Sequence, residues 1–221
     1  MTNKNIIYVC GNLGSGKTTI SEIIAENLGY KYIKADISNC LLASFFSDIK
    51  KYFLQEQLTI LLDKVMKIEE ALSRGMDCVV DRSPYEDVFV FARLFLSEQR
   101  NYGISEEDKN TYFYVAKKIL SDIPRAKLAI YCHTSPETCN TRLKSRTRPF
   151  EKLYPENHIY DLSKLYDEHI HKIDSEMVLK YESETYDIRN LIHKKDFIAE
   201  IKFWLNENTD FVEKKYILTP L

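Results

Sequence analysis

The chain has 221 residues, of which 44% are hydrophobic and 29% charged, and its formal net charge is −2. This length and composition predict one globular domain, and the lack of a basic excess disfavours a long nucleic acid as partner. No apolar run approaches the roughly 18 residues that span a bilayer, and the cysteines form no CxxC pair, so we expect a cytoplasmic protein without a membrane partner.

Short apolar runs alternate along the chain with longer segments of helical periodicity. The runs that we expect to be strands cover residues 6–10, 30–35, 77–81, 127–133 and, more weakly, 185–190. This alternation predicts an α/β fold with a doubly wound parallel sheet and crossover helices. Residues 45–75 should form one long helix that ends near Gly75, and Ser105 and Ser135 should cap later helices. No linker or repeat divides residues 1–221, so a single domain is expected.

The first strand leads into a glycine-rich loop with the sequence GNLGSGKT, which matches the phosphate-binding pattern GxxxxGK[ST]. A strand before the loop and an amphipathic helix after it supply the context that this motif requires. Backbone N–H groups and the helix N-terminus would surround the phosphates of a nucleoside triphosphate such as ATP, with Lys17 on the terminal phosphates and Thr18 on Mg²⁺. The candidate nucleotide-binding residues are Gly11, Asn12, Leu13, Gly14, Ser15, Gly16, Lys17, Thr18 and Thr19.

The strand at residues 77–81 ends in Asp81, which is followed at once by Arg82. Carboxyl ends of parallel strands form the ligand-binding edge of such sheets, so Asp81 is a candidate Mg²⁺ ligand beside the loop. Arg82 could hold a phosphate or the phosphoryl group in transfer, although capping a helix or pairing with Glu86 is an ordinary alternative. The DxxG and NKxD motifs of a GTPase are absent, and the chain is short for a motor protein.

Three arginines, Arg142, Arg146 and Arg148, follow a predicted helix and open a segment interrupted by prolines. Arginines concentrated on such a segment indicate a lid, at about residues 145–156, that closes over phosphates and excludes water. A solvated helix face is the alternative for the arginines taken alone. Together with the phosphate loop, they favour phosphoryl transfer to a small acceptor.

These motifs together resemble the deoxynucleoside kinase family, which includes deoxyadenosine, deoxyguanosine and deoxycytidine kinases. The resemblance covers most of residues 4–206: residues 81–83 (DRS) resemble the family's DRS element, Arg146 and Arg148 its RxR lid, and Arg142 a further arginine of the lid helix. It implies a P-loop kinase fold with a five-stranded parallel sheet, and ATP and Mg²⁺ as cofactors. It also implies transfer of the γ-phosphate to the 5′-hydroxyl of a small-molecule deoxynucleoside, in nucleotide salvage, by a homodimer.

The resemblance also assigns residues to the acceptor. Gln57 and Lys64 match a base-reading glutamine and the basic residue seven positions later, which share one face of a helix. Asp87 matches the acidic partner of that basic residue, and Phe91 matches an aromatic wall. Lys64 is a departure, because the family usually has arginine there. Polar residues on the surface of a helix are the alternative interpretation of Gln57 and Lys64.

Two further departures concern catalysis and the sugar. Asp36 matches, with a local gap, the family's catalytic glutamate, so it is the candidate base for the acceptor hydroxyl. Phe46 stands where the family commonly has a tyrosine that holds the 3′-hydroxyl, while Glu151 matches the second partner of that hydroxyl. One of the two sugar contacts is therefore missing.

Two rival functions remain open from the sequence. A thymidylate kinase shares the phosphate loop and an arginine at the strand end, but typically reads DRY or DRW where this chain reads DRS. An inactive structural or regulatory subunit could retain the fold, although the intact Lys17, Thr18 and Asp81 argue against loss of activity. Base preference and the role of residues 207–221 are not predicted.

Overall fold

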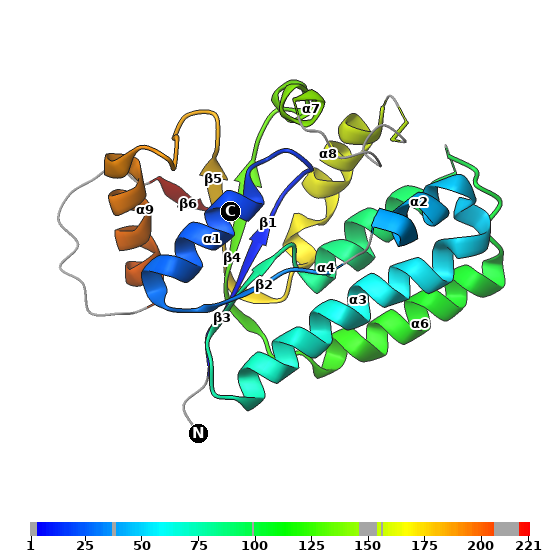
Figure 1. The fold of residues 1–221 in the computed structure, drawn as a ribbon, viewed down its shortest axis with the longest axis horizontal. Helices are drawn as coiled ribbons and strands as arrows, with labels where there is room; N and C mark the ends of the chain where they lie inside the picture. The colour runs from blue at the N-terminus through cyan, green and yellow to red at the C-terminus, as the bar shows by residue number, and fades with distance from the viewer. Residues whose placement is uncertain (1–3, 37–38, 99, 146–153, 156, 206–216) are drawn as a thin grey trace.

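The computed structural model describes residues 4–36, 39–98, 100–145, 154–155, 157–205 and 217–221 (Figure 1). Its strands are β1 (Ile6–Cys10), β2 (Lys31–Ile33), β3 (Cys78–Asp81), β4 (Ala126–His133), β5 (Ser175–Glu182) and β6 (Leu218–Pro220). Its helices are α1 (Lys17–Leu28), α2 (Asn39–Ser47), α3 (Ile49–Ser73), α4 (Pro84–Glu86), the π-helical turn η1 (Asp87–Phe91), α5 (Ala92–Leu96), α6 (Glu106–Asp122), α7 (Pro136–Lys144), α8 (His158–His169), the 3₁₀ turn η3 (Ile170–Lys172) and α9 (Leu191–Trp204).

The strands form one sheet with the order β2-β3-β1-β4-β5-β6. The first five are parallel to their neighbours, while β6 pairs antiparallel with the outer side of β5. The α/β fold class is confirmed, but the expectation of five strands was wrong. The sixth strand comes from the segment 207–221, which had no sequence-based assignment.

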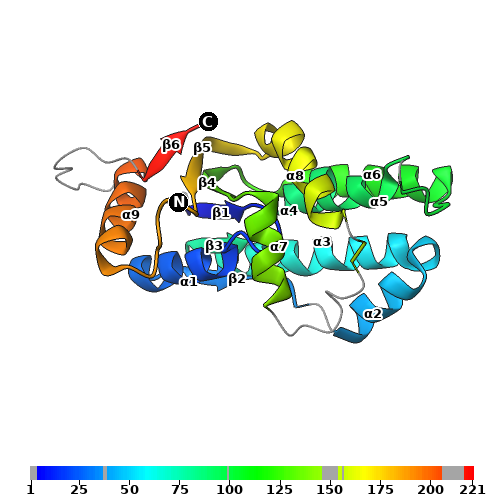
Figure 2. The same cartoon turned by 90° about the horizontal axis from the view of Figure 1, so that it is seen from above.

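Two apolar cores cover the two faces of the sheet. Alternate residues of β1 face opposite sides of the sheet. The set that includes Tyr8 packs with the long helices α3 and α6, and the set that includes Val9 packs with α1 and α9. Figure 1 shows α3 and α6 side by side on one side of the sheet and α1 and α9 on the other, and Figure 2 shows the same layers from above. Because β1 is completely buried, it reads as a continuous apolar run rather than an alternating one.

Two expected elements need correction. The expected long helix is divided at Asp48, which leaves helical geometry and caps α3 by accepting a hydrogen bond from the N–H of Lys51. The weak strand expected at 185–190 was wrong: the fifth strand is Ser175–Glu182, whose alternation of buried and more exposed residues suits the outer part of a sheet. Ser105 and Ser135 cap α6 and α7 as expected.

The C-terminal strand is held by a buried carboxylate on α9. Glu200 accepts hydrogen bonds of 2.7 Å from the main-chain N–H groups of both Ile217 and Leu218. Burial raises the pKa of Glu200, while these two hydrogen bonds act in the opposite direction. The pairing of β6 with β5 therefore depends on a side chain that lies outside both strands.

None of the helices in the described ranges combines the length and the apolar character needed to cross a membrane.

Candidate active site

The phosphate loop lies between the end of β1 and the start of α1. Gly11 and Gly14 have φ angles of 139° and 83°, values that favour glycine. A Cβ at these positions would lie 2.6 Å from the carbonyl oxygen of Cys132 and 2.7 Å from that of Cys139, respectively. The loop thus needs glycine both for its backbone conformation and for its close approach to β4 and α7.

A buried carboxylate from α4 fixes the start of this loop. Oε1 of Glu86 accepts hydrogen bonds from the N–H of Gly11 (2.9 Å) and from the hydroxyl of Tyr166 on α8 (2.7 Å). Oε2 accepts from the N–H of Ser83 (2.6 Å), and Ser83 in turn caps α4 in a capping box. Glu86 therefore joins the phosphate loop, the DRS segment and α8.

Lys17 and Thr18 lie at the N-terminus of α1, next to the end of β3. The Nζ of Lys17 donates to the carbonyl oxygen of Asn12 (2.7 Å), and Thr18 Oγ1 donates to Asp81 Oδ2 (2.6 Å). Tyr32 of β2 donates to the same Asp81 oxygen at 3.2 Å. The pKa of Lys17 is lowered by burial and then by the neighbouring Arg82 guanidinium. Thr19, also predicted to bind nucleotide, is an exposed residue on the same helical turn.

The oxygen atoms of Thr18 and Asp81 suit Mg²⁺, which prefers a few protein oxygens and completes its shell with water and phosphate oxygens. Among the described residues no group of three or more His, Cys, Asp or Glu side chains could hold a metal by itself. The pair therefore fits a metal that arrives with a nucleotide rather than a closed protein metal site.

Arg82 has a φ of 71°, a left-handed backbone conformation that is uncommon for a non-glycine residue. Its guanidinium lies 3.9 Å from the centre of the Phe91 ring, and its main-chain N–H donates to the carbonyl of Val9 (3.0 Å). Burial opposes its charge, but nearby acidic groups, led by Asp87, outweigh burial and raise its pKa. This combination of backbone strain and a desolvated cation is typical of functional sites.

The predicted pairing of Lys64 with Asp87 is present in the structure. Lys64 Nζ donates to Asp87 Oδ2, and only 1% and 3% of the two side chains are exposed. The second oxygen, Oδ1, is buried and has no hydrogen-bond partner in the part of the chain that the structure describes. Burial raises the pKa of Asp87, against the opposing effects of Lys64 and Arg82. The π-helical turn that begins at Asp87 is itself a feature enriched at functional sites.

Gln57 is buried on the same face of α3 as Lys64, so neither is a solvent-facing polar residue. Its Nε2 donates to Oε2 of Glu56 at 2.7 Å. Burial raises the pKa of Glu56 to about 7, although the hydrogen bond from Gln57 acts in the opposite direction. The charges of Asp87 and Arg82 also act on Glu56, which places it in the same electrostatic cluster.

Asp36 lies apart from this cluster. Its side chain is 82% exposed, its carboxylate is 3.6 Å from Lys67 Nζ, and its N–H donates to Asp63. These contacts hold Asp36 against α3, and among the described residues it makes no hydrogen bond to the phosphate loop. Phe46 packs edge to face against Phe45 and Tyr154, so its ring serves as an apolar contact.

Of the segment predicted to form a lid, at about residues 145–156, the structure describes only residues 145 and 154–155. Arg142, in the last turn of α7, donates to the carbonyl of Gly14 (3.3 Å) and to Ser183 Oγ (3.2 Å), which links α7 to the phosphate loop and to the residue after β5. The predicted lid residues Arg146 and Arg148 and the predicted sugar contact Glu151 lie outside the described residues.

Sequence reasoning missed Tyr166 and Glu56, and it named Glu86 only as a possible partner of Arg82. The two glutamates stand next to residues that were identified, Asp87 and Gln57, but only the folded chain shows that both are buried. Tyr166 joins the site from a helix 80 residues away in sequence from Glu86. A capping box at residues 83–86 (SPYE) was the one local signal available for Glu86.

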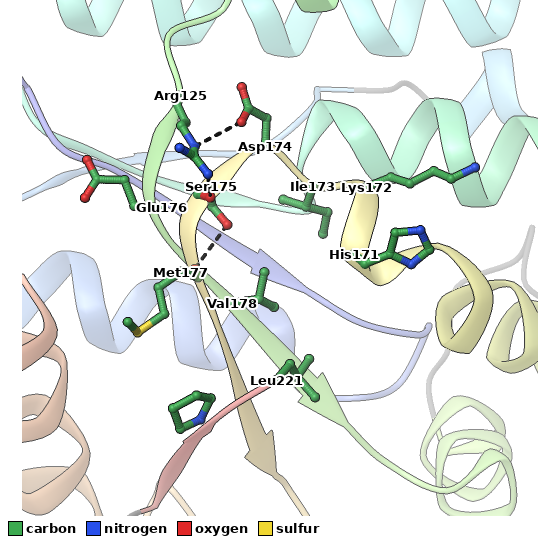
Figure 3. Close-up of a pocket in the computed structure, with 11 residues that line it drawn as sticks. Arg125, His171, Lys172, Ile173, Asp174, Ser175, Glu176, Met177, Val178 and Leu221 are labelled. Carbon is green, nitrogen blue, oxygen red and sulfur yellow. Dashed lines mark hydrogen bonds and ion pairs between the residues drawn. The ribbon is translucent and has the colours of Figure 1, made fainter.

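A pocket of about 460 Å³ lies at the amino ends of β4 and β5, the ends opposite to the phosphate loop (Figure 3). Within it, Arg125 pairs with Asp174 (3.1 Å) and donates to the carbonyl of Ser175 (2.7 Å). Because it lies at the opposite ends of the strands, this pocket is separate from the site at the carboxyl edge.

Comparison with known proteins agrees with this geometry. A deoxyadenosine/deoxycytidine kinase of Bacillus subtilis is 26% identical over 189 residues, which cover 84% of this chain and 86% of that protein. A deoxyadenosine kinase of Dictyostelium discoideum is 30% identical over 168 residues, which cover 76% and 67%. The solved structure of deoxyadenosine kinase from M. mycoides with bound dATP superposes with a TM-score of 0.72 at 25% identity, and covers 91% of this chain and 99% of that one.

The family model for deoxynucleoside kinases matches residues 7–206, which is most of the chain. With this match, and with a phosphate loop, the Thr18–Asp81 pair and a buried polar cluster in the same chain, the protein belongs to the deoxynucleoside kinase family and is a kinase.

Proposed function

We propose that this kinase transfers the γ-phosphate of ATP to the 5′-hydroxyl of a deoxynucleoside whose base enters the cluster of Gln57, Lys64 and Asp87. The observation that carries this assignment is the buried Asp87 Oδ1, which has no hydrogen-bond partner among the residues that the structure describes. A buried acceptor without a partner costs about 1–3 kcal/mol. A nucleobase edge supplies the missing donor, since amino and ring N–H groups line it.

The geometry supports the proposed roles at the phosphates. The loop amides and Lys17 would bind the triphosphate, while Thr18 and Asp81 would hold Mg²⁺, which would neutralise phosphate charge. Arg82 stabilises the charge of the phosphoryl group as it moves to the acceptor. Arg146 and Arg148 are proposed to act with it from the lid, and Arg142 to support the nucleotide through its contact with Gly14.

Asp36 is proposed as the base that accepts the proton of the 5′-hydroxyl. The carboxylate can leave its ion pair with Lys67 at little cost, because the pair is exposed and such pairs stabilise proteins by only about 0–1 kcal/mol. Exchange of Lys67 for the acceptor hydroxyl would therefore cost little. Glu151 is proposed to hold the 3′-hydroxyl, and the apolar Phe46 to pack against the sugar.

A monophosphate acceptor, as for a thymidylate kinase, is disfavoured by the charge of the cluster. Lys64 is already paired with Asp87, and the acidic groups Asp87, Glu86 and Asp81 act on the charge of Arg82. A second phosphate brought by the acceptor would be repelled by these carboxylates and would compete with them for the same cations. An uncharged nucleoside avoids this repulsion, and Phe91 beside Arg82 offers it an aromatic wall.

The test is ADP release with Mg²⁺ and ATP against the four deoxynucleosides and their monophosphates. Turnover of nucleosides in the parent, with a loss in Asp36→Asn and in Lys17→Ala, supports the assignment. Turnover of monophosphates alone would mean that Arg82 binds the phosphate of the acceptor, and it would refute the proposed function. ATP binding without turnover of any acceptor would favour an inactive structural subunit.

We also propose a homodimer. Leu62 and Met66 lie one turn apart on α3 with 42% and 64% of their surface exposed, and Tyr114 on the adjacent α6 is 70% exposed. Large apolar side chains on two neighbouring long helices suit a helix-to-helix contact between copies. Light scattering on the parent and on Met66→Glu measures the expected change from dimer to monomer.

A further inference from the structure

Glu56 has no part in the roles given above, although it lies beside the residue that reads the base. Glu56 and Gln57 are consecutive on α3, and their exposed fractions are 1% and 3%. Acidic side chains are almost never fully buried without a partner. The partner of Glu56 within the described residues is the Gln57 amide, at 2.7 Å.

This hydrogen bond fixes which way the amide points. An ionised carboxylate only accepts hydrogen bonds, so it must face the Nε2 end of Gln57. The carbonyl oxygen Oε1 is then turned away from Glu56, and within the described part of the chain it receives no hydrogen bond. A glutamine without such a neighbour could exchange the positions of its two ends and serve a donor or an acceptor equally well.

Asp87 offers a second acceptor in the same cluster. Lys64 occupies one oxygen of Asp87, and the buried Oδ1 has no partner within the described ranges. The charge of Asp87 acts on Glu56, so the two carboxyl groups belong to one cluster. With the Gln57 amide held by Glu56, both Gln57 Oε1 and Asp87 Oδ1 are available as acceptors, and the buried Asp87 Oδ1 lacks a donor among the described residues.

We propose that Glu56 is a positioning residue that holds the Gln57 amide in one orientation and thereby selects nucleosides with an exocyclic amino group over those with a carbonyl in the same place. The selected bases carry the amino group at C6 of a purine or C4 of a pyrimidine, as in adenine and cytosine. This inference rests on the proposed function, since it concerns the same acceptor site.

The test uses two matched pairs of acceptors, deoxyadenosine against deoxyinosine and deoxycytidine against deoxyuridine. Within each pair only the amino or carbonyl group and the adjacent ring nitrogen differ. The assays are run at pH 8, where Glu56, with a pKa of about 7, is ionised. The variant is Glu56→Gln, which keeps the side-chain shape and can both donate and accept. The control, Glu69→Gln, makes the same change at an exposed position of α3.

We expect Glu56→Gln to lower the ratio of kcat/KM between the amino and carbonyl members of each pair by about tenfold or more. The change should come mainly from the carbonyl substrate, whose KM falls, while kcat on the amino substrate stays within about threefold of the parent. Glu69→Gln should leave both ratios at the parent value. Calorimetric binding of deoxycytidine and deoxyuridine should show the same loss of preference without turnover.

Several results would overturn the inference. Parent turnover of nucleosides with unchanged ratios in Glu56→Gln would refute it and leave the proposed function intact. An equal loss of kcat on all four nucleosides would identify Glu56 as the base and refute a positioning role. If Glu56→Gln fails to fold, Glu56→Met replaces it, with the same expected ratio. Absence of turnover and binding of any nucleoside by the parent would overturn the proposed function together with the inference.

Discussion

Glu86 and Gly11 are joined by a 2.9 Å hydrogen bond in which the carboxylate accepts the N–H of the first loop glycine. The same side chain accepts from Ser83 and from Tyr166. One buried group thus holds three segments that must keep their relative positions when phosphates bind. The shape of the phosphate loop depends on α4 and α8 as well as on its own glycines.

We predict that Glu86→Gln destabilises the protein by about 2–4 kcal/mol, because an amide turns a donor toward groups that need an acceptor. ATP affinity should fall about tenfold as the start of the loop loses its anchor. Urea denaturation and ATP titration measure the two effects, with Glu69→Gln as a surface control. Equal midpoints for the two variants would show that Glu86 does not hold the loop.

The contact between Thr18 and Asp81 gives a second prediction, about the metal. Thr18→Ala should raise the Mg²⁺ concentration for half-maximal activity by about 10–100-fold, since it removes one of two protein oxygens near the ion. Thr19→Ala removes the same hydroxyl from the exposed neighbouring position and should leave the Mg²⁺ requirement unchanged. A similar shift in both variants would argue against this metal site.

Two glycines with similar φ angles allow the cost of a left-handed backbone to be measured separately from the cost of a steric clash. Gly14 and Gly75 have φ of 83° and 70°, but a Cβ at Gly14 would lie 2.7 Å from a carbonyl oxygen, whereas the closest atom to one at Gly75 is a flexible lysine carbon at 3.9 Å. Gly75→Ala should cost about 1–2 kcal/mol from its left-handed conformation alone. Gly14→Ala should cost more and should also abolish ATP binding. Thermal unfolding with and without ATP tests both.

The raised pKa of Glu56 predicts how stability depends on pH. Its value of about 7 exceeds its ordinary 4.5, so the folded state binds more protons than the unfolded state between these two values. The free energy of unfolding should therefore fall as pH rises through this window, by up to about 3 kcal/mol from this group, and stay level above it. The stability of Glu56→Gln relative to the parent should thus increase between pH 4.5 and 8. Denaturant unfolding at several pH values measures this difference, and a constant difference would contradict it.

Much of the phosphate site could be predicted from local sequence, because its parts are short and adjacent. The motif at residues 11–18, the buried runs of β1, β3 and β4, and the serine caps each carry their signal within a few residues. The spacing of Gln57 and Lys64 likewise predicted that both share one helix face, and the structure shows that this face is buried. These features follow from helical geometry and burial, which a single segment already expresses.

The remainder depends on contacts between distant segments. The outer strand Ser175–Glu182 mixes charged and apolar residues, so it lacks the continuous apolar run of a central strand. The break at Asp48 reflects a cap that competes with an otherwise continuous helical pattern. The burial of Glu86 comes from Tyr166 and Gly11, which lie 80 and 75 positions away. None of these arrangements can be predicted from a local sequence pattern.

The hydrogen bonds between Glu200 and the C-terminal segment affect how copies of the protein can associate. β6 occupies the outer edge of β5, and the carboxylate secures its first N–H groups. Without β6, the outer edge of β5 would present a row of free backbone groups, which recruits strands from other chains. Pro220 has no N–H to offer at the new outer edge, so the last residues end the sheet as well as extend it. A short C-terminal segment thereby keeps the sheet from growing into an aggregate.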